Sequence, residues 1–103
     1  TRIGEALAAY LAVPRYAGFA RGAAVVVLSD GLERGDPGVM VDAVRRLARM
    51  AWRLDWLSPL AADPGYRPAT AALSQVLPVL THLGDGSTTE AIAAHILGMA
   101  RRT

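Results

Sequence analysis

The chain has 103 residues, a formal net charge of +2 and 52% hydrophobic side chains, which is enough apolar material for one small domain with its own core. Apart from two histidines, every basic side chain is an arginine, and without lysine the chain cannot house a Walker-type phosphate loop or a Schiff-base enzyme. Cysteine is absent as well, which excludes disulfide scaffolds, thiolate metal sites and cysteine nucleophiles.

The charge balance and the apolar runs indicate neither a nucleic acid nor a membrane as partner. A net charge of +2 is too small to indicate nucleic-acid binding. No apolar run approaches the ~20 residues that cross a bilayer, and the N-terminus lacks a basic region before an apolar stretch. We therefore expect a cytoplasmic protein without a membrane span.

The first elements in chain order are a broken helix and a strand. Apolar side chains repeat at helical spacing over residues 3–11, and Pro14 ends or bends this helix. A second apolar patch over residues 16–20 continues it as far as Gly22. Residues 23–28 then form a continuous apolar run of the kind that suits a strand covered on both faces, as in a parallel sheet.

The next predicted element is a helix from Asp36 to about Trp52, because Asp36 fits an N-cap and Pro37 the first helical position. Its apolar face is formed by Met40, Val44, Leu47, Ala48 and Ala51. The opposite face carries Asp42, Arg45, Arg46, Arg49 and Arg53, among which Asp42 and Arg46 are spaced to pair. Such an arginine row either docks an acidic partner or, more commonly, faces solvent.

The remaining pattern predicts two further strands and two further helices. We expect a strand over residues 54–57, a loop over 63–68, a helix over 69–76, a strand over 79–83 that breaks at 84–86, and a last helix that begins at a capping box of Ser87 and Glu90. Trp56 is expected to pack between sheet and helix. The two histidines, His82 and His95, have no metal-ligand spacing and are interpreted as ordinary strand and helix residues.

Strands that alternate with helices in this order predict an α/β fold, a parallel sheet with helices on both faces. Ligands of such sheets bind beyond the carboxyl ends of the strands. The residues predicted at that edge are Ser29, Asp30 and Gly31 from the first strand, Ser58 from the second, and residues 84–87 from the third. Asp30 either helps to hold a hard cation or a phosphoryl group, or caps the next loop.

Five blocks of this sequence resemble, in order and spacing, the CoxE-like family of von Willebrand factor A (VWA) domain proteins. They are residues 1–7, 26–31, 34–37, 56–60 and 63–68, and the resemblance covers roughly residues 1–80. It implies a Rossmann-like VWA fold of which residues 1–103 are a partial domain, with about three strands and four helices, lacking N-terminal strands. Three places depart from the family pattern: Trp52, where a polar residue is expected, Ser58, where the family more often has asparagine, and residues 84–86.

The resemblance also implies a metal-ion-dependent adhesion site for Mg²⁺. Thr1 and Asp30 match two of the family's metal ligands, whereas its Asp-x-Ser-x-Ser motif does not occur in these 103 residues, so the site in this chain is incomplete. One hydroxyl and one carboxylate hold Mg²⁺ poorly, because the ion requires six oxygens in near-octahedral geometry. The partner-binding rim around this site is assigned to Arg2, Leu32, Glu33, Ser58, Asp63 and Tyr66.

The function that the resemblance implies is metal-dependent protein binding without catalysis. The protein would be an accessory or maturation factor for a molybdenum hydroxylase of the carbon monoxide dehydrogenase type, acting with a MoxR-type AAA+ ATPase. Two alternatives stay open: a phosphoacceptor or small α/β enzyme domain that uses Asp30, and a truncated remnant without a working site. The absence of lysine counts against the phosphoacceptor, because receiver-like domains use a lysine on a later strand.

Overall fold

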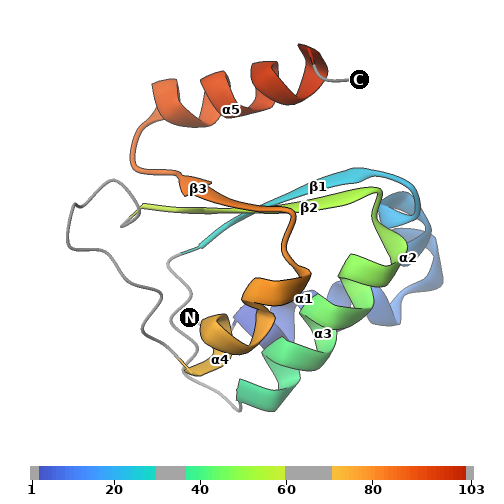
Figure 1. The fold of residues 1–103 in the computed structure, drawn as a ribbon. Coiled ribbons are helices and arrows are strands. Elements are labelled where there is room, and N and C mark those ends of the chain that lie inside the picture. Colours follow the sequence, from blue (N-terminus) through green and yellow to red (C-terminus); the bar gives the residue numbers. More distant parts are fainter. Residues whose placement is uncertain (1–2, 30–36, 60–70, 102–103) are drawn as a thin grey trace.

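The computed structural model describes residues 3–29, 37–59 and 71–101. Helices and strands alternate along these residues as the sequence predicts (Figure 1). The elements are α1 (Ile3–Ala12), α2 (Pro14–Ala20), β1 (Ala24–Leu28), α3 (Pro37–Met50), β2 (Arg53–Ser58), α4 (Ala71–Val76), the short 3₁₀ helix η1 (Leu77–Val79), β3 (His82–Asp85) and α5 (Thr89–Arg101).

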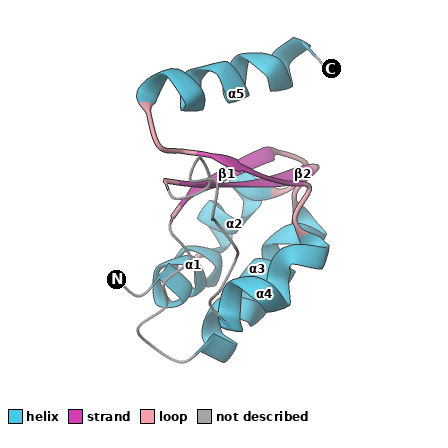
Figure 2. Cartoon of the chain, turned by 60° about the vertical axis from the view of Figure 1, so that its left-hand side comes forward, coloured by secondary structure: helices cyan, strands magenta, loops and turns pink. Residues whose placement is uncertain are grey.

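The three strands form one parallel sheet in the order β1-β2-β3. Helices α1 to α4 lie on one side of the sheet and α5 crosses the other side (Figure 2). This arrangement confirms the predicted α/β class with helices on both faces and is consistent with a Rossmann-like fold. In the register, Val26 of β1 lies beside Asp55 of β2, and Asp55 lies beside His82 of β3.

The core lies between the sheet and the helices below it. Residues 54–58 of the central strand β2 are all buried, because β2 has a neighbouring strand on each side and helices on both faces. Trp56 is fully buried, as expected from the sequence, and its indole Nε1 donates a hydrogen bond of 2.9 Å to the carbonyl oxygen of Ser29. Met40 and Val44 of α3, both 0% exposed, pack on the same side.

The predicted interruption at Pro14 is confirmed. α1 ends at Ala12, Val13 adopts an extended conformation, and Pro14 opens α2 at a position where its missing N–H is not needed. After α2, Gly22 takes a φ of 73°, which glycine adopts without steric cost. Its N–H donates to the carbonyl of Met50, which ties this turn to the end of α3 and directs the chain into β1.

The predicted strand over residues 79–83 is wrong in its limits. Residues 77–79 form η1, and β3 begins at His82 and includes Gly84 and Asp85. Thr81 determines the start of β3, because its N–H donates to the carbonyl of Leu54 and its hydroxyl accepts from the N–H of Leu54. Gly84 does not break the strand: a Cβ there would lie 2.7 Å from the Nε2 of His82, so glycine permits a close approach within β3.

The expected capping box of Ser87 and Glu90 is also wrong. The Oγ1 of Thr88, one residue later, accepts a hydrogen bond of 3.0 Å from the N–H of Ala91 and so caps α5. The N–H of Ser87 donates instead to Asp85, which turns the chain between β3 and α5.

Two expectations for the polar face of α3 need correction as well. Arg53 belongs to β2 rather than to the helix, because α3 ends at Met50 and the chain becomes extended at Arg53. Asp42 and Arg46 are both exposed, and they form no ion pair in the described part of the chain. Arg45, Arg46 and Arg49 are exposed, as the periodicity predicts.

One surface feature of the fold is the edge formed by β1. Among the described residues β1 pairs only with β2, and Leu28 at its end is 56% exposed. Phe19 of the neighbouring α2 is 67% exposed.

None of the described helices is both long enough and apolar enough to cross a bilayer.

Candidate functional site

The carboxyl ends of the three strands meet at one edge of the sheet, where the sequence predicts the ligand site (Figure 1). Ser29 follows β1, Ser58 ends β2 and Asp85 ends β3. The N–H of Ser29 donates to the carbonyl of Leu57, and the N–H of Gly86 donates to the carbonyl of Ser58, so the ladder continues to this edge. The predicted contributions of the second and third strands are therefore brought together.

Asp85 is the described carboxylate at this edge. Hydrogen bonds from the hydroxyl and the backbone N–H of Ser87 hold the pKa of Asp85 below its usual range, whereas burial opposes this shift. The backbone nitrogen of Ser87 lies 2.7 Å from Oδ1 of Asp85. Asp85 is thus an ionised carboxylate at neutral pH, with oxygens that can accept hydrogen bonds. Part of its hydrogen-bonding capacity is already used by Ser87, in the turn that leads into α5.

Ser58 is the one predicted rim residue that the structure describes. Its side chain is 0% exposed, so in this conformation the hydroxyl does not reach the surface. The adjacent Gly86 lies close to β2, since a Cβ at this position would be 3.1 Å from the backbone carbonyl oxygen of Leu57. A partner could therefore contact the Ser58 side chain only after a change of conformation that exposes it.

The other predicted site residues lie outside the described residues. These are Thr1 and Asp30 of the metal site and Arg2, Leu32, Glu33, Asp63 and Tyr66 of the rim. Within residues 3–29, 37–59 and 71–101, no group of three or more histidine, cysteine or acidic side chains is placed to hold a metal ion. The described residues alone therefore do not fit a Mg²⁺ site, and this assignment depends on Thr1 and Asp30.

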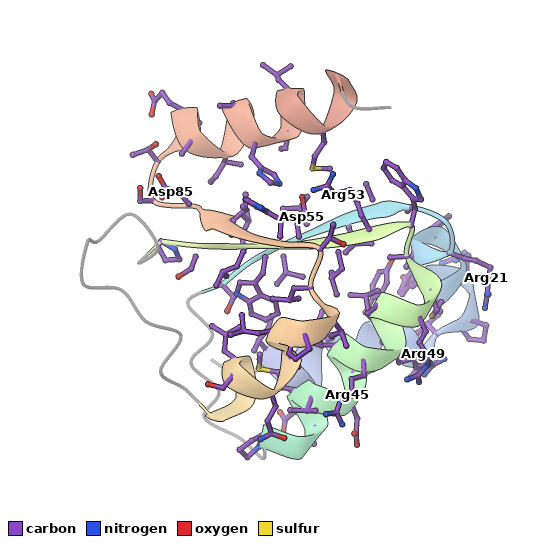
Figure 3. The ribbon with its side chains drawn as sticks, in the orientation of Figure 1. Arg21, Arg45, Arg49, Arg53, Asp55 and Asp85 are labelled. Atoms are coloured by element: carbon purple, nitrogen blue, oxygen red, sulfur yellow. The ribbon has the colours of Figure 1, made fainter. Side chains whose placement is uncertain are left out.

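A second polar cluster, centred on Asp55, lies between the sheet and α5 (Figure 3). The carboxylate of Asp55 is fully buried and accepts two hydrogen bonds from Arg53, 3.0 Å from Nε to Oδ1 and 2.8 Å from Nη2 to Oδ2. The Nε2 of His95 lies 2.5 Å from Oδ2, and because a carboxylate only accepts, the ring nitrogen is the donor. The ring of His82 stacks on His95 with centroids 5.0 Å apart.

Sequence reasoning missed this cluster. The Arg53–Asp55 pair could have been found from the sequence, because the two residues are two apart and a strand places such residues on the same face. No local pattern links Asp55 to His95, which is 40 residues away. The hydrogen-bonding partners of Asp55 are basic side chains of this chain, so the cluster acts as an ion-pair network that fastens α5 to β2.

Comparisons with known proteins support one family. Neither the curated proteins nor the solved structures gave a match to this chain. A family model described as "VWA domain containing CoxE-like protein" matches residues 1–92. The match extends beyond the region of roughly 80 residues that the five sequence blocks indicated, and it includes β3 and the start of α5. The chain therefore belongs to the family of VWA-domain-containing CoxE-like proteins.

Proposed function

We propose that this chain is a metal-dependent protein-binding module, part of an accessory factor that acts with a MoxR-type AAA+ ATPase on a molybdenum hydroxylase of the carbon monoxide dehydrogenase type. The family match over residues 1–92 carries this proposal, because the VWA domain of CoxE-like proteins is an accessory domain. The parallel sheet, whose polar carboxyl-end edge is the usual ligand position in α/β folds, supports it. A cytoplasmic location and a partial VWA domain over residues 1–103 belong to the same proposal.

The proposed Mg²⁺ ligands are Thr1 and Asp30. Asp30 directly follows Ser29, which continues the β1–β2 ladder at the carboxyl-end edge. Mg²⁺ prefers six oxygens and dehydrates reluctantly, so these two residues leave several positions to water or to a partner. When bound, the ion would supply a Lewis-acidic position for an acidic side chain of the partner protein.

The proposed rim consists of side chains that would contact the partner around this position. It comprises Arg2, Leu32, Glu33, Ser58, Asp63 and Tyr66. Loops beyond the strand ends commonly carry binding residues on a rigid sheet, which supports this placement. Ser58 would contribute only after a change of conformation, because its side chain is buried.

We further propose that the domain has no catalytic activity of its own. In the described residues, the one aspartate–histidine contact belongs to the Asp55 network, in which Arg53 occupies both carboxylate oxygens. An enzyme or phosphoacceptor that uses Asp30, or a remnant without a working site, would give different results in the experiment below.

The first test is a calorimetric titration of the full chain with Mg²⁺. Because Thr1 and Asp30 alone hold Mg²⁺ poorly, we expect weak binding, which Asp30→Ala abolishes. Asp42→Ala should preserve it, because Asp42 is an exposed acid of α3 and is not one of the proposed ligands. Unchanged Mg²⁺ affinity in Asp30→Ala would refute the metal assignment.

The second test measures binding of the chain to a purified MoxR-type ATPase by surface plasmon resonance, with Mg²⁺ and with EDTA. We expect binding in Mg²⁺ that EDTA and Asp30→Ala both weaken. Incubation with acetyl phosphate provides the contrast: a phosphorylated chain that loses the modification in Asp30→Ala would support the phosphoacceptor instead. Absence of metal binding, partner binding and phosphorylation would support the remnant.

A further inference from the structure

A groove between α2 and α3 collects three arginines, Arg21, Arg46 and Arg49. Its volume is about 630 Å³, within the range of roughly 300–1,000 Å³ usual for ligand sites. Arg21 follows the last residue of α2, whereas Arg46 and Arg49 come from the last two turns of α3. The sequence predicts the α3 arginines to share a face, but only the fold brings Arg21 beside them.

The three guanidinium groups have no anionic partner in the described part of the chain. Arg53, in contrast, does not line the groove and is paired with Asp55 between the sheet and α5, so the groove keeps its charge. Arg46 and Arg49 are three residues apart on one helix, a spacing at which like charges repel. A bound anion would relieve this repulsion and accept the bidentate hydrogen bonds that guanidinium groups offer to carboxylates.

The floor of the groove is aliphatic. Leu11 and Ala17, which are 2% and 6% exposed, lie beneath the arginines together with Met50. None of the described residues that line the groove is aromatic, so they offer no stacking surface of the kind that single-stranded nucleic acids use. The arginines at the walls fit the carboxylates of an acidic peptide, and the aliphatic floor fits a leucine-like side chain of the same peptide.

The groove lies away from the predicted metal edge. Figure 3 shows Arg21 and Arg49 on one side of the molecule and Asp85 at the other end of the sheet. We propose that the α2–α3 groove is a second, metal-independent docking surface, which binds an acidic, leucine-containing segment of a partner protein through Arg21, Arg46 and Arg49.

The test uses the full chain and a short fluorescein-labelled peptide of glutamates and leucines, with fluorescence anisotropy as readout. Arg46→Ala/Arg49→Ala should raise the Kd about tenfold, because two exposed charge pairs together contribute about the free energy of one decade in affinity. Arg45→Ala is the matched control, since Arg45 is exposed on the same helix but does not line the groove. It should leave the Kd unchanged.

Four further measurements complete the test. EDTA should not affect binding, which separates this surface from the metal-dependent function proposed above. Raising the salt concentration should weaken binding by screening the exposed charges, and a peptide with glutamines in place of glutamates should bind much more weakly. Circular dichroism should confirm that each variant is folded.

The proposal is overturned by any of four results. These are no binding of the glutamate peptide, an equal loss in Arg45→Ala, equal binding of the glutamine peptide, or tighter binding of a single-stranded oligonucleotide of the same charge. The last result would assign the groove to nucleic acid.

Discussion

Replacing Asp55 by alanine is expected to reduce the free energy of unfolding by about 3 kcal/mol. The Asp55 side chain is 0% exposed, and its partners Arg53 and His95 are 12% and 14% exposed. Without the carboxylate, a guanidinium group and an imidazole remain beneath α5 with no acceptor. The substitution therefore leaves uncompensated polar groups in a buried position.

The magnitude follows from the burial of the three side chains. Removing one partner of a buried ion pair costs about 3–5 kcal/mol, and we expect the lower end because Arg53 and His95 retain a little exposure and can turn towards water. Domains are stable by only about 5–15 kcal/mol, so the loss is a large fraction of the total. At about 4 °C per kcal/mol, the Tm should fall by about 12 °C.

His95→Ala should cost less, about 1.5 kcal/mol, because Asp55 keeps both hydrogen bonds from Arg53. Its effect should be concentrated in α5, whose amides should exchange faster with deuterium. His82→Ala is the control, since His82 stacks on His95 but has no hydrogen bond to Asp55 among the described contacts.

Urea denaturation of the three variants measures the differences in unfolding free energy, and hydrogen exchange measures the effect on α5. A loss below about 1 kcal/mol in Asp55→Ala would show that the network contributes little. Equal losses in Asp55→Ala and His95→Ala, or unchanged exchange of α5 in His95→Ala, would contradict the role of the cluster in fastening α5.

Three other predictions concern the core, the α5 cap and pH. Trp56→Phe should cost about 1–3 kcal/mol in urea denaturation, because it removes a fully buried indole and its hydrogen bond to the carbonyl of Ser29. Trp52→Phe, at a residue 58% exposed, should stay within about 0.5 kcal/mol of the parent. Thr88→Ala should lower stability by about 1 kcal/mol through loss of the cap; an equal or larger loss of α5 helicity in Ser87→Ala would restore the capping box predicted from sequence. Because hydrogen bonds from Ser87 lower the pKa of Asp85 on folding, ionised Asp85 stabilises the fold above its unfolded pKa of 3.8, and this stabilisation is lost as the pH falls through the folded pKa. NMR titration of Ser87→Ala should show the pKa of Asp85 rising towards 3.8, and an unchanged pKa would refute this cause.

The sequence predicts most of the element order because hydrophobic periodicity and helix breakers act locally. Pro14 separates α1 from α2, and Pro37 opens α3, each at a position where a missing N–H is harmless. The limits of β3 and the presence of η1 were not predicted correctly. The limits of this strand depend on hydrogen bonds between Thr81 and Leu54, two residues far apart in the chain, and no local pattern contains them.

The candidate sites divide in the same way. The polar strand ends Ser29, Ser58 and Asp85 could be placed at one edge from the sequence, because parallel strands bring their carboxyl ends together. The burial of Ser58 could not, since it depends on which segments cover the end of β2. Thr1 and Asp30 lie outside the described residues, so their part in a metal site stays a prediction from the family resemblance.

The sequence by itself determined the α/β class, the family and part of the buried face of α3, because each is encoded in residue patterns along continuous stretches of chain. Met40, Val44 and Leu47 are buried as predicted, whereas Ala51 lies beyond the end of α3. Only the tertiary structure decided that His95 meets Asp55 and that Arg21 lies beside the arginines of α3. The physical reason is that these contacts join separate elements, and their geometry depends on how the helices pack on the sheet. The Asp55 cluster and the arginine groove between α2 and α3 both arise in this way.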